Sequence, residues 1–227
     1  MQLSLVYLCS RILLLMWVSN LLWKNLACQP ACTMKNGKCH VTFQELIMRA
    51  ATVSQYLSIQ CSRLFNEFDK RYARDQRFSH KTLSSCHTTS LATPETMEQA
   101  QQLHPEVLLK LIVSILGSWT QPLQQVVTEI GHMQSAPDVL LSIARNIQKK
   151  GKRLLEGMKK ILKKVPKKDK RKVKYAVWSG LASLQVTIED CKHFAFYNLF
   201  HCLSNDVNKV DTYFKALKCQ LVYPYYC

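Results

Sequence analysis

Hydrophobic side chains recur every three or four residues in four long segments of this chain, and polar side chains fill the positions between them. That spacing places the apolar residues on one face of an α-helix. It predicts helices over residues 43–72, 105–130, 139–165 and 187–217. Pro122 lies inside the second segment and should kink it, because proline lacks the N–H group of a helical hydrogen bond. No alternating pattern in the sequence indicates strands, so the predicted fold class is all-α.

The linkers between these segments differ in length. The first, from residue 73 to residue 104, and the third, from residue 166 to residue 186, are long, whereas the second is short. Parallel neighbours need a crossover as long as a helix, whereas antiparallel neighbours need only a few residues. Long, short and long linkers therefore predict a long-chain four-helix bundle with up-up-down-down topology.

The amino-terminal segment has the pattern of a cleaved secretory signal. Arg11 precedes an apolar run over residues 12–18, and small residues follow a few positions later. Polar residues interrupt the run before it reaches the roughly 18–20 apolar residues that a membrane span needs. We expect a signal at residues 1–28, with the cut between residues 27 and 31, and one secreted domain at residues 29–227.

The sequence contains ten cysteines. In an exported protein, which folds in an oxidising compartment, an even number of cysteines indicates disulfides. Cys9 leaves with the signal, and the fate of Cys28 depends on the cut. Eight others remain: Cys32, Cys39, Cys61, Cys86, Cys191, Cys202, Cys219 and Cys227. Short loops favour the pairs Cys32–Cys39 and Cys219–Cys227, and the sequence by itself leaves the other pairings open.

Motifs of catalysis and of metal or cofactor binding do not occur in the sequence. It contains no Cys-x-x-Cys pair, no glycine-rich phosphate loop and no nucleophile elbow, and its seven histidines are scattered. We therefore predict that the protein is not an enzyme and that it uses no cofactor and no metal.

Most of the net charge of +16 lies in residues 149–174, which contain fourteen Lys or Arg and two acids. The fourteen cations are Lys149, Lys150, Lys152, Arg153, Lys159, Lys160, Lys163, Lys164, Lys167, Lys168, Lys170, Arg171, Lys172 and Lys174. At 100° per residue, the cations of the predicted third helix share one arc, and its apolar residues share the opposite arc. The apolar arc should face the bundle and the basic arc should face solvent.

Several partners could explain a basic face of this kind. Membrane insertion would need the apolar arc that the bundle already uses. DNA and RNA are disfavoured as partners because the protein is expected to be exported and its sequence contains no nucleic-acid-binding motif. A merely solvated helix face and a dock for heparin or heparan sulfate both stay open, and we favour the dock because acids are so few. Lys168 to Arg171 (KDKR) also has the spacing that prohormone proteases recognise.

Five segments resemble the prolactin and growth hormone family in order along the chain. They are NEFDKRYARDQRFSHKTLSSCHTTSLATPE, LIVSILGSWTQPLQQVVTE, KRLLEGM, VWSGLASLQ and FYNLFHCLSNDVNKVDTYFKALKC. The extra amino-terminal loop Cys32–Cys39 is similar to prolactins, and the divergence and the basic stretch resemble a placental member. The resemblance implies a cytokine-type four-helix bundle and a secreted hormone that binds a single-pass cytokine receptor.

The resemblance also implies three disulfides, Cys32–Cys39, Cys86–Cys202 and Cys219–Cys227. Cys61 and Cys191 depart from the pattern of the family. Each lies on the apolar stripe of its own helix, and the first and fourth helices are antiparallel neighbours in this topology. We therefore predict a fourth disulfide, Cys61–Cys191, with two buried free thiols as the alternative.

The first receptor site of the family combines the fourth helix, the first helix and the first crossover. The matching residues here are Lys209, Asp211, Tyr213, Lys215, Lys218, Arg71 and Tyr72. Gly157 stands where the family places a small residue of its second receptor site. Prolactins carry zinc- and pH-sensitive histidines where Gln55, Ser58 and Asn208 stand here, which argues against the prolactin receptor itself as the partner.

These observations predict a secreted, placental-type hormone that acts through a receptor and binds heparin or heparan sulfate with its third helix and the following loop. The alternative is a matrix-bound protein without signalling of the prolactin type.

Overall fold

The computed structural model describes residues 33–35, 38–73, 78, 81–133, 137–166 and 172–223. The chain divides into two units, Met1–Glu45 and Leu46–Cys227. In the described part of the first unit, strands β1 (Thr33–Lys35) and β2 (Lys38–His40) pair antiparallel. The predicted signal and its cut lie outside the described residues.

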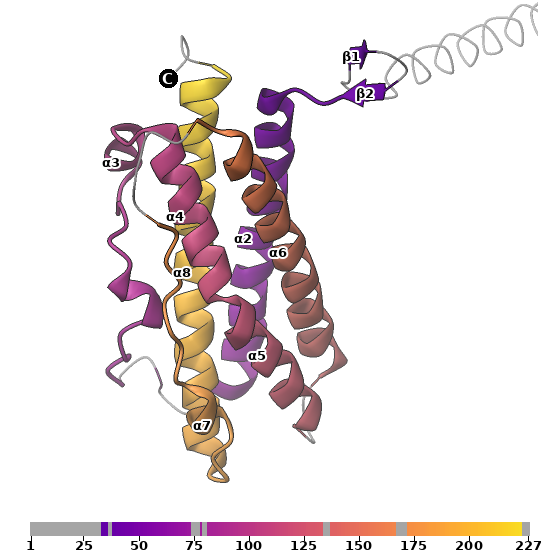
Figure 1. Ribbon diagram of the computed structural model, residues 1–227. Coiled ribbons are helices and arrows are strands. Elements are labelled where there is room, and N and C mark those ends of the chain that lie inside the picture. The colour runs from indigo at the N-terminus through magenta and orange to yellow at the C-terminus, as the bar shows by residue number, and fades with distance from the viewer. Residues whose placement is uncertain are drawn as a thin grey trace, which may run out of the picture. The chain divides into compact units, whose positions relative to one another are not determined.

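Four long helical segments form an all-α bundle (Figure 1). They are α2 (Phe43–Phe68), α4 (Pro105–Ser118) with α5 (Thr120–His132), α6 (Asp138–Lys164), and α8 (Glu189–Leu221). The first two segments run in one direction and the last two in the opposite direction, which confirms the up-up-down-down bundle. Short helices complete the long connections: η1 (Asp69–Ala73), η3 (His87–Ser90), α3 (Met97–Gln101) and α7 (Leu181–Leu184). None of the described helices is long and apolar enough to cross a membrane.

Aromatic rings join the end of α2 to α8. The Phe68 ring is fully buried, and its centroid lies 5.1 Å from that of Phe200 and 5.9 Å from that of Phe196. Burial of such rings is the main source of stability for a bundle. The apolar stripe of α8 begins after Cys191, which we had placed on it, because Cys191 is exposed and Ile188 is 65% exposed.

The second helical segment breaks at Trp119, three residues before the predicted kink at Pro122. In a continuous helix the N–H group of residue 122 would donate to the carbonyl of Ser118, but proline has no such group. Nε2 of His87, in the first crossover, lies 3.3 Å from the Ser118 carbonyl oxygen and donates to it. The proline therefore frees an acceptor, and the first crossover occupies it.

The same break is bound to α8 through a buried carboxylate. Trp119 Nε1 donates to Asp206 Oδ2 at 2.7 Å, and Thr88 Oγ1 donates to the same oxygen at 2.7 Å. Burial raises the pKa of Asp206, and this effect outweighs the two hydrogen bonds and the nearby His87 and Lys209, which lower it. One carboxylate thus joins the first crossover, the helix break and α8.

The raised pKa of Asp206 makes a testable contribution to stability. The unfolded chain releases this proton near the ordinary value of 3.8, whereas the folded chain keeps it to a higher pH. The contribution is therefore fully present below about pH 4 and is lost as the pH rises. Asp206→Asn keeps an acceptor for both donors but does not titrate. Urea unfolding should show wild type losing free energy of unfolding relative to Asp206→Asn between pH 4 and pH 7.

Asp138→Asn is the control, because it removes a carboxylate that is exposed at the start of α6. The difference in free energy of unfolding between wild type and Asp138→Asn should not fall in this way between pH 4 and pH 7. If wild type instead gains stability relative to Asp206→Asn over that range, Asp206 is stabilised as a carboxylate and the assigned direction is wrong.

Candidate functional site

The cations of α6 lie on its outer face. Lys150 is half-buried and Arg145 is exposed, as are the seven further cations between residues 149 and 164: Lys149, Lys152, Arg153, Lys159, Lys160, Lys163 and Lys164. The opposite face supplies the buried residues Leu140, Ile143, Ala144, Ile147, Leu154, Leu155, Met158 and Ile161. This helix packs against α4 and α5. The predicted segregation of charge and apolar surface is confirmed for α6.

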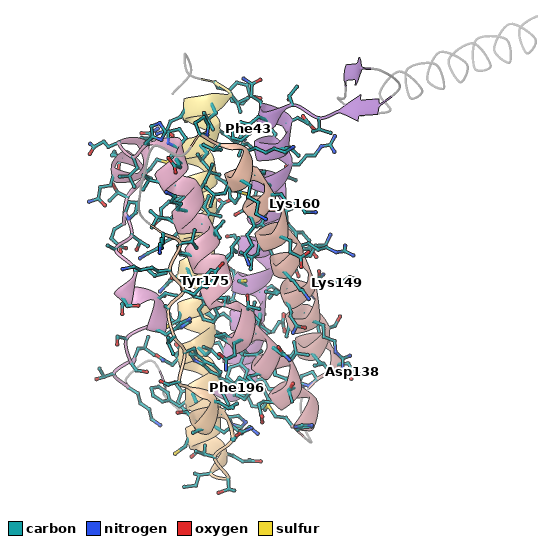
Figure 2. The ribbon with its side chains drawn as sticks, viewed as in Figure 1. Phe43, Asp138, Lys149, Lys160, Tyr175 and Phe196 are labelled. Carbon is teal, nitrogen blue, oxygen red and sulfur yellow. A yellow bond between two sulfur atoms is a disulfide. The ribbon has the colours of Figure 1, made fainter. Side chains whose placement is uncertain are left out.

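The seven exposed cations between residues 149 and 164 form two rows along α6. Lys149, Arg153, Lys160 and Lys164 make one row, and Lys152, Lys159 and Lys163 make the other. Residues 149 and 164 are separated by about 22 Å at 1.5 Å per residue. Glu156 is the acid within this stretch. We call the seven exposed cations the basic ridge; Figure 2 labels Lys149 and Lys160 on it.

Gly157 lies at the edge of the basic ridge and is half-buried. A Cβ atom added to it would meet no other group within 4 Å. The packing of this chain therefore does not require a glycine there, although glycine costs about 1 kcal/mol relative to alanine inside a helix.

The connection from α6 to α8, which is the second long crossover, passes α4 before it reaches α8 (Figure 1). We call residues 172–178 the strap. Lys172 and Lys174 are exposed on it, and Tyr175 is 48% exposed. Lys167, Lys168, Lys170 and Arg171, and with them the predicted protease motif, lie outside the described residues.

A second surface joins the first crossover to α8. Lys209 Nζ lies 2.6 Å from Glu95 Oε1, and Tyr213 Oη donates to the Pro94 carbonyl oxygen at 2.7 Å. A cleft of about 660 Å³ separates these elements. Tyr213 is only 1% exposed, which argues against the predicted contact with a receptor. Its ring is buried in the core, and its hydroxyl holds the crossover.

The other predicted receptor residues do not form one surface. The Asp211 carboxylate is nearly buried and pairs with Lys215 Nζ at 2.9 Å, while Lys215 itself is exposed and Lys218 is half-buried. Arg71, which is exposed, and Tyr72 lie in η1 at the other end of the bundle.

The Tyr72 ring centroid is 4.5 Å from that of His193, and His193 precedes Lys209 by about 24 Å along α8. The structure therefore does not bring η1 and Lys209 together.

Polar residues that we did not predict line the exposed side of α8. Asn205 and Asn208 are exposed there, and Ser204 and Thr212, at helical spacing from them, are half-buried. The spacing itself was visible in the sequence, but short uncharged polar residues are typical of any solvated helix. Ser58 Oγ donates to Asn208 Oδ1 at 2.6 Å, so these two polar side chains of α2 and α8 are in contact. The described residues contain no group of three or more His, Cys, Asp or Glu that could hold a metal ion.

The predicted disulfide Cys86–Cys202 is present and joins the first crossover to α8, with 5.5 Å between the two Cα atoms. Because it spans 116 residues, the chain-entropy model gives it about 4–5 kcal/mol. Cys219 is also in a disulfide, and its predicted partner Cys227 lies outside the described residues. The predicted Cys32–Cys39 disulfide is not tested, because Cys32 lies outside the described residues.

The predicted disulfide Cys61–Cys191 is wrong, because both thiols are free, Cys61 buried and Cys191 exposed. The contacts of Ser58 with Asn208 and of Phe68 with Phe200 set the antiparallel register of α2 and α8. In that register Cys61 is level with about residue 205, fourteen residues from Cys191. This offset is about 20 Å, whereas a disulfide needs Cα atoms 4.4–6.8 Å apart.

The family to which the chain belongs follows from comparison of its sequence with known families. The model of the somatotropin hormone family matches residues 14–227. The chain belongs to the somatotropin hormone family. This family consists of secreted hormones rather than enzymes, and its members bind single-pass cytokine receptors.

The two free thiols of this family member should react differently. Burial raises the pKa of the Cys61 thiol, so it is both shielded and protonated. Alkylation of the native protein followed by peptide mapping should modify Cys191 and leave Cys61 unmodified until urea unfolds the chain. A peptide in which Cys61 and Cys191 are joined, or modification of Cys61 at the native rate of Cys191, would contradict the structure.

Proposed function

We propose that this protein is a secreted prolactin-like hormone that acts through a cytokine-type receptor and is held at the cell surface by heparan sulfate on its basic ridge. The observation that carries the glycan assignment is the outward orientation of all seven ridge cations on a helix whose apolar face is fully used by the bundle.

The ridge has the electrostatic form that a sulfated chain needs. Seven cations lie within about 22 Å along one side of a rigid helix, so their potentials add at a linear polyanion. Binding would release condensed counterions and weaken steeply with added salt, as it does for other polyanions. Outside the cell the abundant polyanions are heparan sulfate and related glycosaminoglycans.

The buried face of α6 argues against insertion into a membrane. A cationic amphipathic helix binds lipid with its apolar face, but here that face includes Leu154, Leu155 and Met158, which are at most 6% exposed. Insertion would require the helix to leave α4 and α5. A sulfated polymer needs only the exposed face.

Neutralising part of the ridge should weaken heparin binding. Lys160, Lys163 and Lys164 are exposed in the last two turns of α6. The triple variant Lys160→Gln, Lys163→Gln and Lys164→Gln should elute from heparin at clearly lower salt than wild type. The slope of log Kd against log salt should fall by roughly 2 to 3, because three cations no longer displace counterions.

The matched control removes three exposed cations from α2 and η1, as Arg63→Gln, Lys70→Gln and Arg71→Gln. It has the same net charge as the ridge variant and should elute close to wild type. If the two variants elute at the same salt concentration, heparin binding depends only on net charge, and the ridge is an ordinary solvated helix face.

The exposed side of α8 is the surface that we propose for the receptor. Ser204, Asn205, Asn208 and Thr212 are accessible there. The Lys209–Glu95 ion pair and the Tyr213–Pro94 hydrogen bond fix the adjacent part of the first crossover. Such a preformed surface loses little conformational entropy on binding. Gly157 lies on α6, and its open surroundings would let a second receptor approach closely.

The prolactin receptor itself should bind poorly and without help from zinc. Gln55, Ser58 and Asn208 offer no imidazole, and Ser58 and Asn208 bond to each other. A titration against the prolactin receptor ectodomain, with and without zinc, should show neither nanomolar affinity nor zinc dependence. A variant with histidine at all three positions is the matched comparison and should gain zinc dependence.

Nanomolar affinity of the wild-type protein for that receptor would contradict this prediction. Heparin binding without binding to any cytokine-type receptor would instead favour the alternative of a matrix-bound protein.

A further inference from the structure

The Tyr175 ring packs against Gly117 of α4, where the absence of a side chain leaves room for it. A Cβ atom at Gly117, near the end of α4, would overlap Cδ1 and Cε1 of the Tyr175 ring and would lie 2.9 Å from its Cζ. Any other residue at position 117 would therefore push the ring outward. Figure 2 shows Tyr175 where the second crossover passes α4.

The residue after the tyrosine is fastened to the same turn of α4. The Ala176 N–H group donates to Ser118 Oγ at 2.7 Å, and Ser118 Oγ in turn donates to the Ser114 carbonyl oxygen at 2.8 Å. Ser118 is buried, so this hydrogen bond is shielded from water. Gly117 and Ser118 together hold the strap at two consecutive residues.

The ridge reaches the strap at this point. Lys159 Nζ lies 5.6 Å from the centroid of the Tyr175 ring, within the range of a cation–π interaction. Lys159 extends from α6, which packs against α4, and Tyr175 lies on α4. The ring therefore fills the space between the ridge and the strap, with Lys174 beside it in the chain.

Two exposed cations, Lys172 and Lys174, are carried by the strap, and neither has an ion-pair partner among the described residues. Tethered cations contribute more to the binding of a polyanion than cations on a free loop, because less conformational entropy is lost when they bind. Strap and ridge then present cations from two elements to one ligand.

We infer that the sulfated-glycan site has two sides, the basic ridge and the strap, and that Tyr175 is the positioning residue that joins them. This inference rests on the proposed glycan binding. Tyr175 does not need to touch the glycan. Its ring contacts Lys159 of the ridge and packs on Gly117, which fixes the strap residue next to Lys174, so a sulfated chain contacts both sides at once.

Variants that change no charge test this inference. Gly117→Ala and Tyr175→Ala keep every cation but displace or release the strap. Each should lower the salt concentration of elution from heparin and reduce the slope of log Kd against log salt by about 1 to 2, corresponding to the loss of Lys172 and Lys174 from the site. Tyr175→Phe keeps the ring against Gly117 and under Lys159, and it should bind like wild type.

A double-mutant cycle separates positioning from a general loss of structure. Lys172→Gln with Lys174→Gln should weaken heparin binding in the wild-type background and have little effect in the Tyr175→Ala background, because the strap cations are already lost. Thermal unfolding shows whether each variant is folded. Elution of the Lys160, Lys163 and Lys164 triple variant gives the loss of binding that removal of ridge cations causes. Equal losses in both backgrounds would overturn the role of Tyr175.

The outcomes distinguish this inference from the function on which it rests. If wild-type protein and the ridge triple variant elute together, glycan binding on the ridge fails. If the triple variant binds heparin more weakly but Gly117→Ala and Tyr175→Ala elute like wild type, glycan binding by the ridge is supported and the two-sided site is refuted.

Discussion

The missing N–H group of Pro122 is the constraint on which the arrangement of this molecule depends. It ends α4 at Ser118 and releases the Ser118 carbonyl, to which His87 of the first crossover donates. The Ser118 hydroxyl accepts the Ala176 N–H group of the strap, and Trp119 reaches Asp206 of α8. A bundle with two long crossovers needs an attachment for each, because a long connection is otherwise held only at its ends. Here one turn of backbone serves both.

This attachment separates the two kinds of surface that the hormone presents. The first crossover is fixed to α8 by the Cys86–Cys202 disulfide and by the hydrogen bond of Tyr213 to Pro94, beside the polar side of α8 that we propose for the receptor. The strap is fixed at Gly117 and Ser118 of α4, and its Tyr175 ring contacts Lys159 of α6. The proposed glycan and receptor surfaces therefore lie on different elements of the bundle. Gly157, at the edge of the ridge, is the place where the two could interfere.

Much of the fold could be predicted from the sequence, because amphipathic periodicity reports which face of a helix is buried. The basic and apolar arcs of α6 follow directly from that principle. Contacts between elements were harder to predict. Cys61 and Cys191 occupy apolar stripes of neighbouring antiparallel helices, but a stripe does not fix the axial register, which is set by the contact of Phe68 with Phe200. Tyr213 matched a family position, yet its neighbours at helical spacing place it in the core. The Gly117–Tyr175 contact joins residues 58 positions apart, and no local pattern in the sequence indicates it.

The claim that one broken turn fastens the crossovers can be tested by native-state hydrogen exchange, which resolves single N–H groups. The Ala176 amide lies in a strap without regular secondary structure, and in this account only its bond to Ser118 protects it. We predict that it exchanges far more slowly than an unstructured amide, with an opening free energy close to that of the Trp119 indole N–H group. Exchange of the Ala176 amide at the rate of a free peptide, while Trp119 stays protected, would show that the strap is not attached there and would contradict the account.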